Sequence, residues 1–177
     1  MSKPLHGWIA HPFNVPRRLR HWLTDRGSLT QRLKARCADF RVQPVVTGYA
    51  RAHLDERTPL KLRAGSIDYV REVLLACNQG NVVFAHSVLP RTGLRGGWNG
   101  ITRLGSRPLG EALFDDHRIR RGTLAYLRLG SRHPLFRAAS RHHRIHARTL
   151  WARRSVFCLN GHPLMVTEVF LPEIESL

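Results

Sequence analysis

The stretch SVFCLNGHPLMVTEVFL, residues 155–171, carries the clearest structural signal in the sequence. It predicts two strands, 155–159 and 164–171, joined at Asn160-Gly161, because Asn-Gly favours the tight turns that connect antiparallel strands. Both faces of the second strand are apolar apart from Glu168. Since a strand alternates its side chains between two faces, Glu168 is predicted to be a carboxylate within a buried strand.

Further strands are predicted on either side of a second turn, Asn78-Gln79-Gly80-Asn81. These are residues 67–77 and 82–89; weaker strand character lies at 42–49 and 123–129, and helical spacing at 15–37. Strands joined by hairpins, with helices before and between them, predict an α+β fold with a single antiparallel sheet of about six strands. No GxGxxG or GxxxxGK[ST] motif occurs, which excludes the dinucleotide-binding and phosphate-loop enzymes.

A second charged residue, Arg71, lies within a predicted strand. Alternation places Arg71 on the more apolar face with Val73 and Leu75, and Glu72 on the other face. A buried guanidinium must be paired or must bind an anion, because burying it alone costs much free energy. Two interpretations stay open: Arg71 and Glu168 form a buried ion pair, or they line a closed cavity. In such a cavity Arg71 would bind the carboxylate of a small ligand and Glu168 a hydroxyl.

The overall charge is strongly positive. The 177 residues include 29 Lys and Arg against 12 Asp and Glu, a formal charge of +17, with 42% hydrophobic residues, enough for one ordinary core. This charge favours anionic partners. Only Lys3, Lys34 and Lys61 are lysines, however. A genome rich in G and C favours arginine codons over lysine codons, and this bias alone can produce the same excess of arginine on a solvated surface. We interpret the arginine-rich run 132–154 as such a surface and expect no nucleic-acid partner.

Cysteine and histidine usage gives no metal or redox motif. Cys37, Cys77 and Cys158 are odd in number and far apart, so we expect reduced, mostly buried thiols in a cytoplasmic protein. No apolar run approaches the ~20 residues of a membrane span, and the N-terminus has no apolar stretch of the signal-peptide type. His142 and His146 have helical ligand spacing, but no carboxylate or cysteine nearby completes a set. No metal site and no cofactor are expected.

Several short segments resemble the chorismate pyruvate-lyase family, bacterial enzymes that make 4-hydroxybenzoate for ubiquinone. Each is weak alone, but together they follow one another in order over most of the chain. The segments are Trp22-Leu23, Ser28-Leu29-Thr30, Arg71 to Leu75, Leu104-Gly105, Pro108-Leu109-Gly110, Leu113-Phe114, Leu150-Trp151, Arg153-Arg154-Ser155, Gly161, Pro163-Leu164, Thr167-Glu168 and Phe170-Leu171-Pro172.

The resemblance implies a compact α+β monomer, with helices covering one side of the sheet and an enclosed ligand. It implies that Arg71 binds the product carboxylate and Glu168 the phenolic hydroxyl, and that these two residues serve the elimination of pyruvate from chorismate. Leu29 and Leu109 match two further binding positions, at which backbone amides matter more than the side chains. Arg128 and Arg153 are candidates for the enolpyruvyl carboxylate. The product would pass to a membrane-bound prenyltransferase, so transient membrane contact is expected.

The whole chain, 1–177, is expected to be one domain, with a flexible N-terminus at 1–14. Residues 131–149 look longer than their family counterpart and are expected to form an extended loop. Two other functions stay open: a non-catalytic domain of the same fold that senses a small carboxylate, and a basic protein that associates with nucleic acid or membranes. The first lacks room for a winged helix before Phe40; the second would show steep loss of binding with salt.

Overall fold

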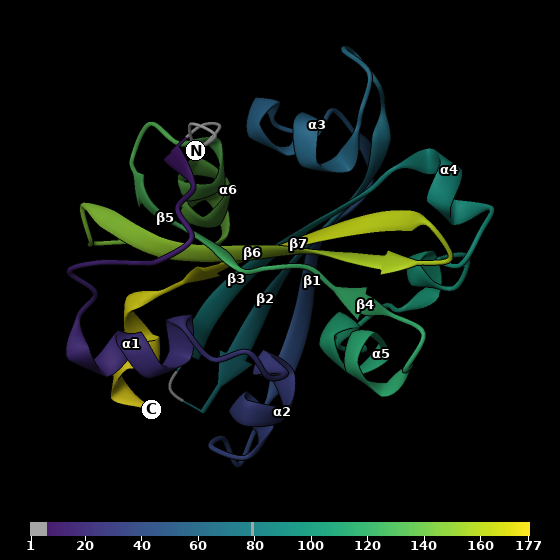
Figure 1. Ribbon diagram of the computed structural model, residues 1–177. Coiled ribbons are helices and arrows are strands. Elements are labelled where there is room, and N and C mark those ends of the chain that lie inside the picture. Colours follow the sequence, from purple (N-terminus) through teal and green to yellow (C-terminus); the bar gives the residue numbers. More distant parts are fainter. Residues whose placement is uncertain (1–6, 79) are drawn as a thin grey trace.

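One antiparallel sheet forms the centre of the protein, shown in the computed structural model of Figure 1, which describes residues 7–78 and 80–177. Its strand order is β1-β2-β3-β7-β6-β4, and β5 also pairs with β6. The strands are β1 (Arg41–Ala50), β2 (Asp68–Cys77), β3 (Gly80–Leu89), β4 (Arg120–Arg121), β5 (Ala125–Gly130), β6 (Thr149–Leu159) and β7 (His162–Phe170). The α+β class, the single antiparallel sheet and the two hairpins β2–β3 and β6–β7 are confirmed.

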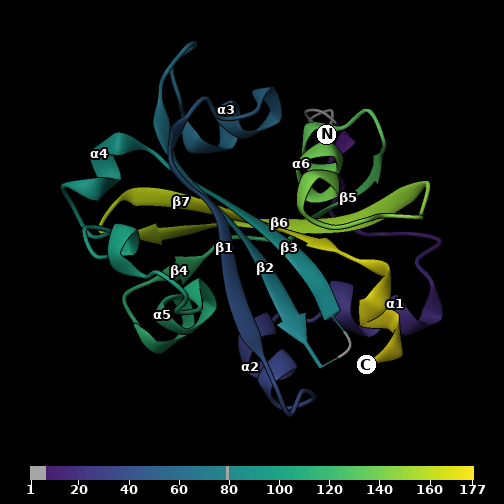
Figure 2. The ribbon, with the colours of Figure 1, turned by 180° about the vertical axis from the view of Figure 1, so that it is seen from behind.

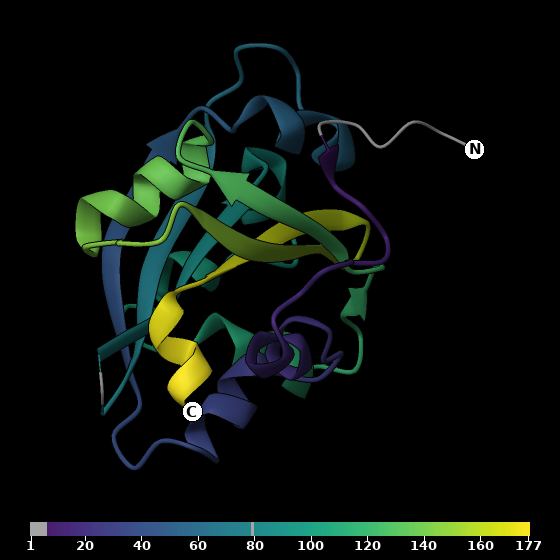
Figure 3. The same cartoon turned by 90° about the vertical axis from the view of Figure 1, so that its left-hand side faces the viewer.

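The helices lie against both faces of the sheet, not one as predicted. Figures 1 and 2 show α3 and α6 on one side and α1, α2 and α5 on the other, and Figure 3 shows the same two layers after a turn of 90°. The helices are α1 (Arg17–Leu23), α2 (Leu29–Lys34), α3 (Leu54–Leu60), α4 (Arg91–Leu94), α5 (Leu109–Asp115) and α6 (Pro134–His142), with short 3-10 turns at Ile101–Arg103 and Pro172–Ser176.

Alternation along β2 explains the two layers, because every residue of this strand is buried. Val73 and Leu75 pack in the cluster that contains the apolar residues of α1 and α2. Leu74, between them, points the other way and packs with α6, and Val70 packs near the end of α3. A strand that is apolar on both faces needs cover on both faces.

The segment 131–149, expected to be an extended loop, instead contains α6. His133 precedes the helix and its ring Nδ1 accepts a hydrogen bond from the Leu135 amide at 3.2 Å, while Pro134 occupies the first helical position. The apolar residues share one face and are buried: Leu135, Phe136, Ala138 and Ala139. The density of arginine and histidine in this segment concealed the apolar spacing of a helix.

The N-terminal segment also differs from the expectation of flexibility where the structure describes it. Trp8 is buried and its indole N–H donates to Asp55 at 2.7 Å. Ile9 pairs with Tyr126 through two backbone hydrogen bonds of 2.9 and 2.8 Å. Residues 1–6, the rest of the predicted flexible stretch, lie outside the described residues.

Cys37 and Cys77 form a disulfide, so the expectation of three reduced thiols is wrong. The two Cα atoms are 5.5 Å apart although the residues are 40 positions apart in sequence. Because the segment after α2 returns to the end of β2, the fold brings together two cysteines whose sequence spacing carries no pairing signal. Cys158 is free and half-buried.

The disulfide should contribute measurably to stability. Closing a loop of this length restricts the unfolded chain and stabilises the fold by about 4 kcal/mol. For a chain of this size, reduction of the disulfide should therefore lower the Tm by roughly 8–16 °C. Calorimetry with and without dithiothreitol measures the change. Thiol titration of the unfolded protein should count one free thiol before reduction and three after.

Two variants control this experiment. Cys158→Ala should keep the full response to reductant, whereas Cys37→Ala/Cys77→Ala should show none. Three free thiols in the protein before reduction would contradict the disulfide.

Candidate active site

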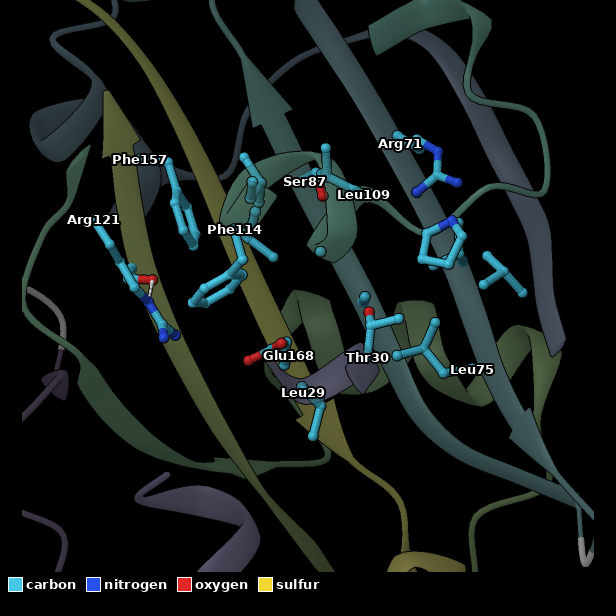
Figure 4. A pocket seen from close by; sticks show the side chains of 18 residues that line it. Leu29, Thr30, Arg71, Leu75, Ser87, Leu109, Phe114, Arg121, Phe157 and Glu168 are labelled. Atoms are coloured by element: carbon cyan, nitrogen blue, oxygen red, sulfur yellow. Dashed lines mark hydrogen bonds between the residues drawn. The ribbon is translucent and has the colours of Figure 1, made fainter. Parts of the chain in front are cut away.

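A pocket lies between the sheet and the beginnings of α2 and α5 (Figure 4). Its empty volume, counted with its opening to solvent, is about 570 Å³. The lining includes all four residues that the sequence predicted for a site: Leu29, Arg71, Leu109 and Glu168. Four segments far apart in sequence therefore meet at one place.

The floor of the pocket is formed by two neighbouring rows of side chains that cross the sheet. One row runs Arg71, Ser87, Val166, Ser155, and the next runs Val73, Ala85, Glu168 and continues beyond the pocket lining to Arg153. The strands of Arg71 and Glu168, β2 and β7, are separated by β3, so the two backbones are about 9.6 Å apart. That separation leaves room for a ring-sized ligand between the two charged groups.

Arg71 is a buried guanidinium without a carboxylate partner among the residues that the structure describes. It is 3% exposed, and its Nη2 donates to the carbonyls of Gly105 and Arg107 at 2.9 and 3.1 Å. Gly105 has a φ of +52°, which suits glycine and helps the loop turn these carbonyls toward Arg71. Burial lowers the pKa of the Arg71 guanidinium. The remaining N–H groups are positioned for an anion from outside the protein.

Glu168 pairs with Arg153, so the interpretation of a direct Arg71–Glu168 ion pair is wrong. Arg153 Nε donates to Glu168 Oε2 at 2.5 Å. Arg153 is 1% exposed, and its Nη1 donates to the carbonyl of Trp22 at 3.0 Å and that of Leu23 at 3.4 Å. This side chain is therefore committed to structural contacts. It holds the Glu168 carboxylate by one oxygen and leaves Oε1 free to accept a hydrogen bond in the pocket.

Arg121, which sequence reasoning did not select, is a second arginine of the pocket. Its Nε donates to Ser155 Oγ at 2.9 Å and its Nη1 to the Arg26 carbonyl at 2.7 Å. The guanidinium lies 5.3 Å from the ring centres of Phe114 and Phe157. It belongs to a two-residue strand in an arginine-rich stretch, so neither strand alternation nor composition distinguished it from surface arginines.

The three charged groups of the pocket come from three different strands, β2, β7 and β4. Figure 4 shows Arg121 and Arg71 on opposite sides of the pocket with Glu168 between them, as the strand order requires. Burial lowers the pKa of the Arg121 guanidinium while the Glu168 carboxylate raises it. An arginine keeps its charge at neutral pH despite such a shift. The pocket can thus hold two anionic groups, one at each end, and a hydroxyl near the middle.

The two leucines are the first residues of the two helices that cover the pocket. Ser28 precedes α2 and caps it, because its Oγ accepts from the Gln31 amide at 3.3 Å; Leu29 follows. Leu109 begins α5 after Pro108. The first amides of a helix have no partner within it. A Cβ at Gly110 would lie 2.6 Å from Thr30 Oγ1, so glycine permits the close approach of α5 to α2.

The other arginines proposed from sequence are placed differently. Arg128 is exposed, donates to Thr149 Oγ1 at 3.0 Å and does not line the pocket. Within residues 7–78 and 80–177, the group of side chains that could bind a metal ion lies on the opposite face of the sheet and not in the pocket: His53, Glu56 and His86.

Known relatives cover the chain almost completely. The model of the chorismate lyase family matches residues 10–176. A probable chorismate pyruvate-lyase of Thiobacillus denitrificans is 59% identical over 169 residues, covering 96% of this chain and 90% of that protein. One of Nitrosomonas europaea is 45% identical over 177 residues, covering 100% and 99%.

Solved structures show the fold at much lower identity. The ligand-binding domain of a putative GntR-family transcriptional regulator from Bordetella bronchiseptica has a TM-score of 0.54 at 18% identity, covering 77% of this chain and 86% of that one. The effector domain of PhnF from Mycobacterium smegmatis has a TM-score of 0.51 at 15% identity, covering 83% and 90%. These show a shared architecture, whereas the sequence relatives show descent: the chain belongs to the chorismate lyase family.

Proposed function

We propose that this protein eliminates pyruvate from chorismate and releases 4-hydroxybenzoate. The observation that carries the proposal is the pocket itself, in a member of the chorismate lyase family. It places Arg71, a buried arginine without a carboxylate partner among the described residues, on β2, with β3 between this strand and the strand of Glu168. A ring with a carboxylate at one end and a hydroxyl at the other complements this pair.

The chemistry demands little from the protein beyond binding and orientation. The ether bond between the ring and the enolpyruvyl group breaks, and the ring carbon that bears the hydroxyl loses its hydrogen as a proton. The ring becomes aromatic, and the departing enolate takes up a proton to become pyruvate. Aromatisation drives the reaction, so the site has to hold the dianion in a reactive geometry and stabilise the charge of the leaving group.

The order of the charged groups fits the substrate. With the ring carboxylate on Arg71, the para hydroxyl points toward Glu168 Oε1. The enolpyruvyl group is on the carbon next to the hydroxyl, so its carboxylate falls at the same end of the ring, toward Arg121. Arg121 thus takes the role for which Arg128 and Arg153 were the candidates. Leu29 and Leu109 would hold the ring from the helix side, with their amides directed at the ligand.

The cellular setting is part of the proposal. The product would enter ubiquinone biosynthesis from a monomeric, cytoplasmic enzyme, with transient contact to a membrane or a membrane-bound prenyltransferase. A net charge of +17 favours contact with an anionic membrane surface. Among the described residues no helix has both the length and the apolar character needed to cross a bilayer.

The first test is the conversion of chorismate to 4-hydroxybenzoate, followed by ultraviolet absorbance. Arg71→Ala should weaken product binding by more than about tenfold, because it removes a charge-assisted contact in a buried site. Arg103→Ala, an exposed arginine of the neighbouring segment, is the matched control and should bind as the wild type does. Unchanged product affinity in Arg71→Ala would show that Arg71 does not bind the ring carboxylate. Tight product binding by a wild-type protein without turnover would indicate a sensor.

Glu168→Gln tests the carboxylate at nearly constant volume. It should reduce kcat/KM about 100-fold if the carboxylate assists proton movement in the transition state, and it also removes the charged partner of Arg153. Steady-state kinetics measure the loss, and the circular dichroism spectrum shows that the variant is folded although the lost ion pair should lower its Tm. Glu175→Gln is the control. Wild-type kinetics in Glu168→Gln would remove this residue from the mechanism.

Arg121→Gln should affect the binding of the substrate but not that of the product. It should raise the KM for chorismate at least tenfold while the Kd for 4-hydroxybenzoate stays within about twofold, since the product lacks the enolpyruvyl carboxylate. Arg128→Gln should leave both unchanged. The reverse outcome, an effect of Arg128→Gln and none of Arg121→Gln, would show that the assignment is wrong.

A further inference from the structure

A second cluster of polar side chains lies behind the pocket, on the opposite face of β2 and β3. His53 precedes α3, Glu56 lies in its first turn, and His86 lies in β3. One donor atom from each residue falls within 4.8 Å of the others. Glu56 and His86 are 1% and 3% exposed. Imidazole nitrogen and carboxylate oxygen in this combination are the ligands that zinc takes in proteins.

The atoms that face one another in this cluster have no hydrogen-bond partner. His53 Nε2, Glu56 Oε1 and His86 Nε2 are all buried and unsatisfied. His86 Nε2 and Glu56 Oε1 are 3.1 Å apart and form an ion pair when His86 carries a proton. His53 Nε2 is the one of the three atoms that faces no partner at all among the described residues. Buried polar atoms are nearly always satisfied, so an unpartnered nitrogen beside the His86–Glu56 pair points to a cation that all three atoms could share.

The surroundings hold these ligands in place. His86 Nδ1 contacts Glu72 Oε1 at 2.9 Å, the carboxylate–histidine arrangement that orients metal-binding imidazoles and increases their basicity. The backbone N–H of His53 donates to Glu56 Oε2 at 2.7 Å, which leaves Oε1 directed at the imidazoles. The ring centres of His53 and His86 are 5.1 Å apart, with 24° between the ring planes. Glu56 and His86 are thus each fixed by a contact made through another of their atoms.

We propose that His53 Nε2, Glu56 Oε1 and His86 Nε2 bind one zinc ion, with a water molecule in the fourth position. The half-buried His53 gives the ion a path from solvent. The two carboxylates Glu56 and Glu72 balance the two charges of the ion. The site stands apart from the pocket, since His86 and Glu72 point to the face opposite Ser87 and Arg71.

A proton is the alternative occupant. Burial lowers the pKa of His86, but the Glu56 and Glu72 carboxylates outweigh this and raise the pKa to about 10. A proton on His86 Nε2 satisfies that nitrogen and the facing Glu56 Oε1, 3.1 Å away, but it leaves the buried His53 Nε2 without a partner in the described part of the chain. Zinc and the proton compete, and the titration is best performed at pH 8.

The test is calorimetric titration of the chelator-treated, full-length protein with zinc, and with cobalt(II) as a spectroscopic probe of ligand geometry. The wild type should bind one zinc ion tightly, and the cobalt form should show the intense visible bands of a four-coordinate site. His53→Ala should bind zinc at least about 100-fold more weakly and Glu72→Gln about 10- to 100-fold more weakly. His117→Ala, which removes an exposed histidine, is the matched control and should bind like the wild type.

Folding is checked independently of the metal. His53 is half-buried and lies outside the helices and strands, so His53→Ala should keep the circular dichroism spectrum of the wild type and its affinity for 4-hydroxybenzoate. Equal zinc binding by wild type and His53→Ala would overturn the site, as would a wild type that binds no zinc tightly. Both results are independent of the lyase assay, so the two proposals stand or fall separately.

Discussion

Arg153 reaches from the middle of β6 to two parts of the molecule at once. Its guanidinium binds the Glu168 carboxylate on the adjacent strand and the carbonyls of Trp22 and Leu23 at the end of α1. The N-terminal helices are thereby tied to the centre of the sheet, and α2, which follows directly, is held over the pocket. Removing one partner of such a buried pair typically costs about 3–5 kcal/mol, because the other charge is left uncompensated. One side chain therefore joins the stability of the fold to the orientation of the carboxylate in the pocket.

The sequence identified the parts of the pocket that follow from local rules. Alternation within single strands placed Arg71 and Glu168 on inward faces, and an Asn-Gly turn fixed the hairpin that carries Glu168. The pairing of Glu168 could not be obtained in this way, because alternation gives the face of a residue and not its neighbour. Arg153 was available as a candidate for a ligand group, and only the register of β6 against β7 shows that it serves Glu168.

The parts that sequence reasoning missed depend on tertiary contacts. Arg121 lies in a two-residue strand whose place is set by pairing with β6. Such a strand is too short to show the alternation of apolar and polar residues by which a strand is predicted. α6 is concealed by basic residues on its exposed face, and the Cys37–Cys77 disulfide depends on the return of the chain over 40 residues. The fold shared with regulator domains likewise gives no function by itself, since one architecture can carry many sites. The positions of charged groups in the pocket distinguish the functions.

The alternation of β2 has a consequence for how this protein can change in evolution. Arg71 faces the pocket, Glu72 faces the His86 cluster and Val73 faces the pocket again, so consecutive residues serve opposite sides of the sheet. A strand of this kind tolerates substitutions one at a time, but the loss or gain of a single residue would exchange the two sets of side chains. The pocket would then receive a carboxylate beside Glu168, and the opposite layer a guanidinium beside His86. Insertions and deletions in relatives that keep both sites should therefore be confined to segments outside β2, such as the turn at its end.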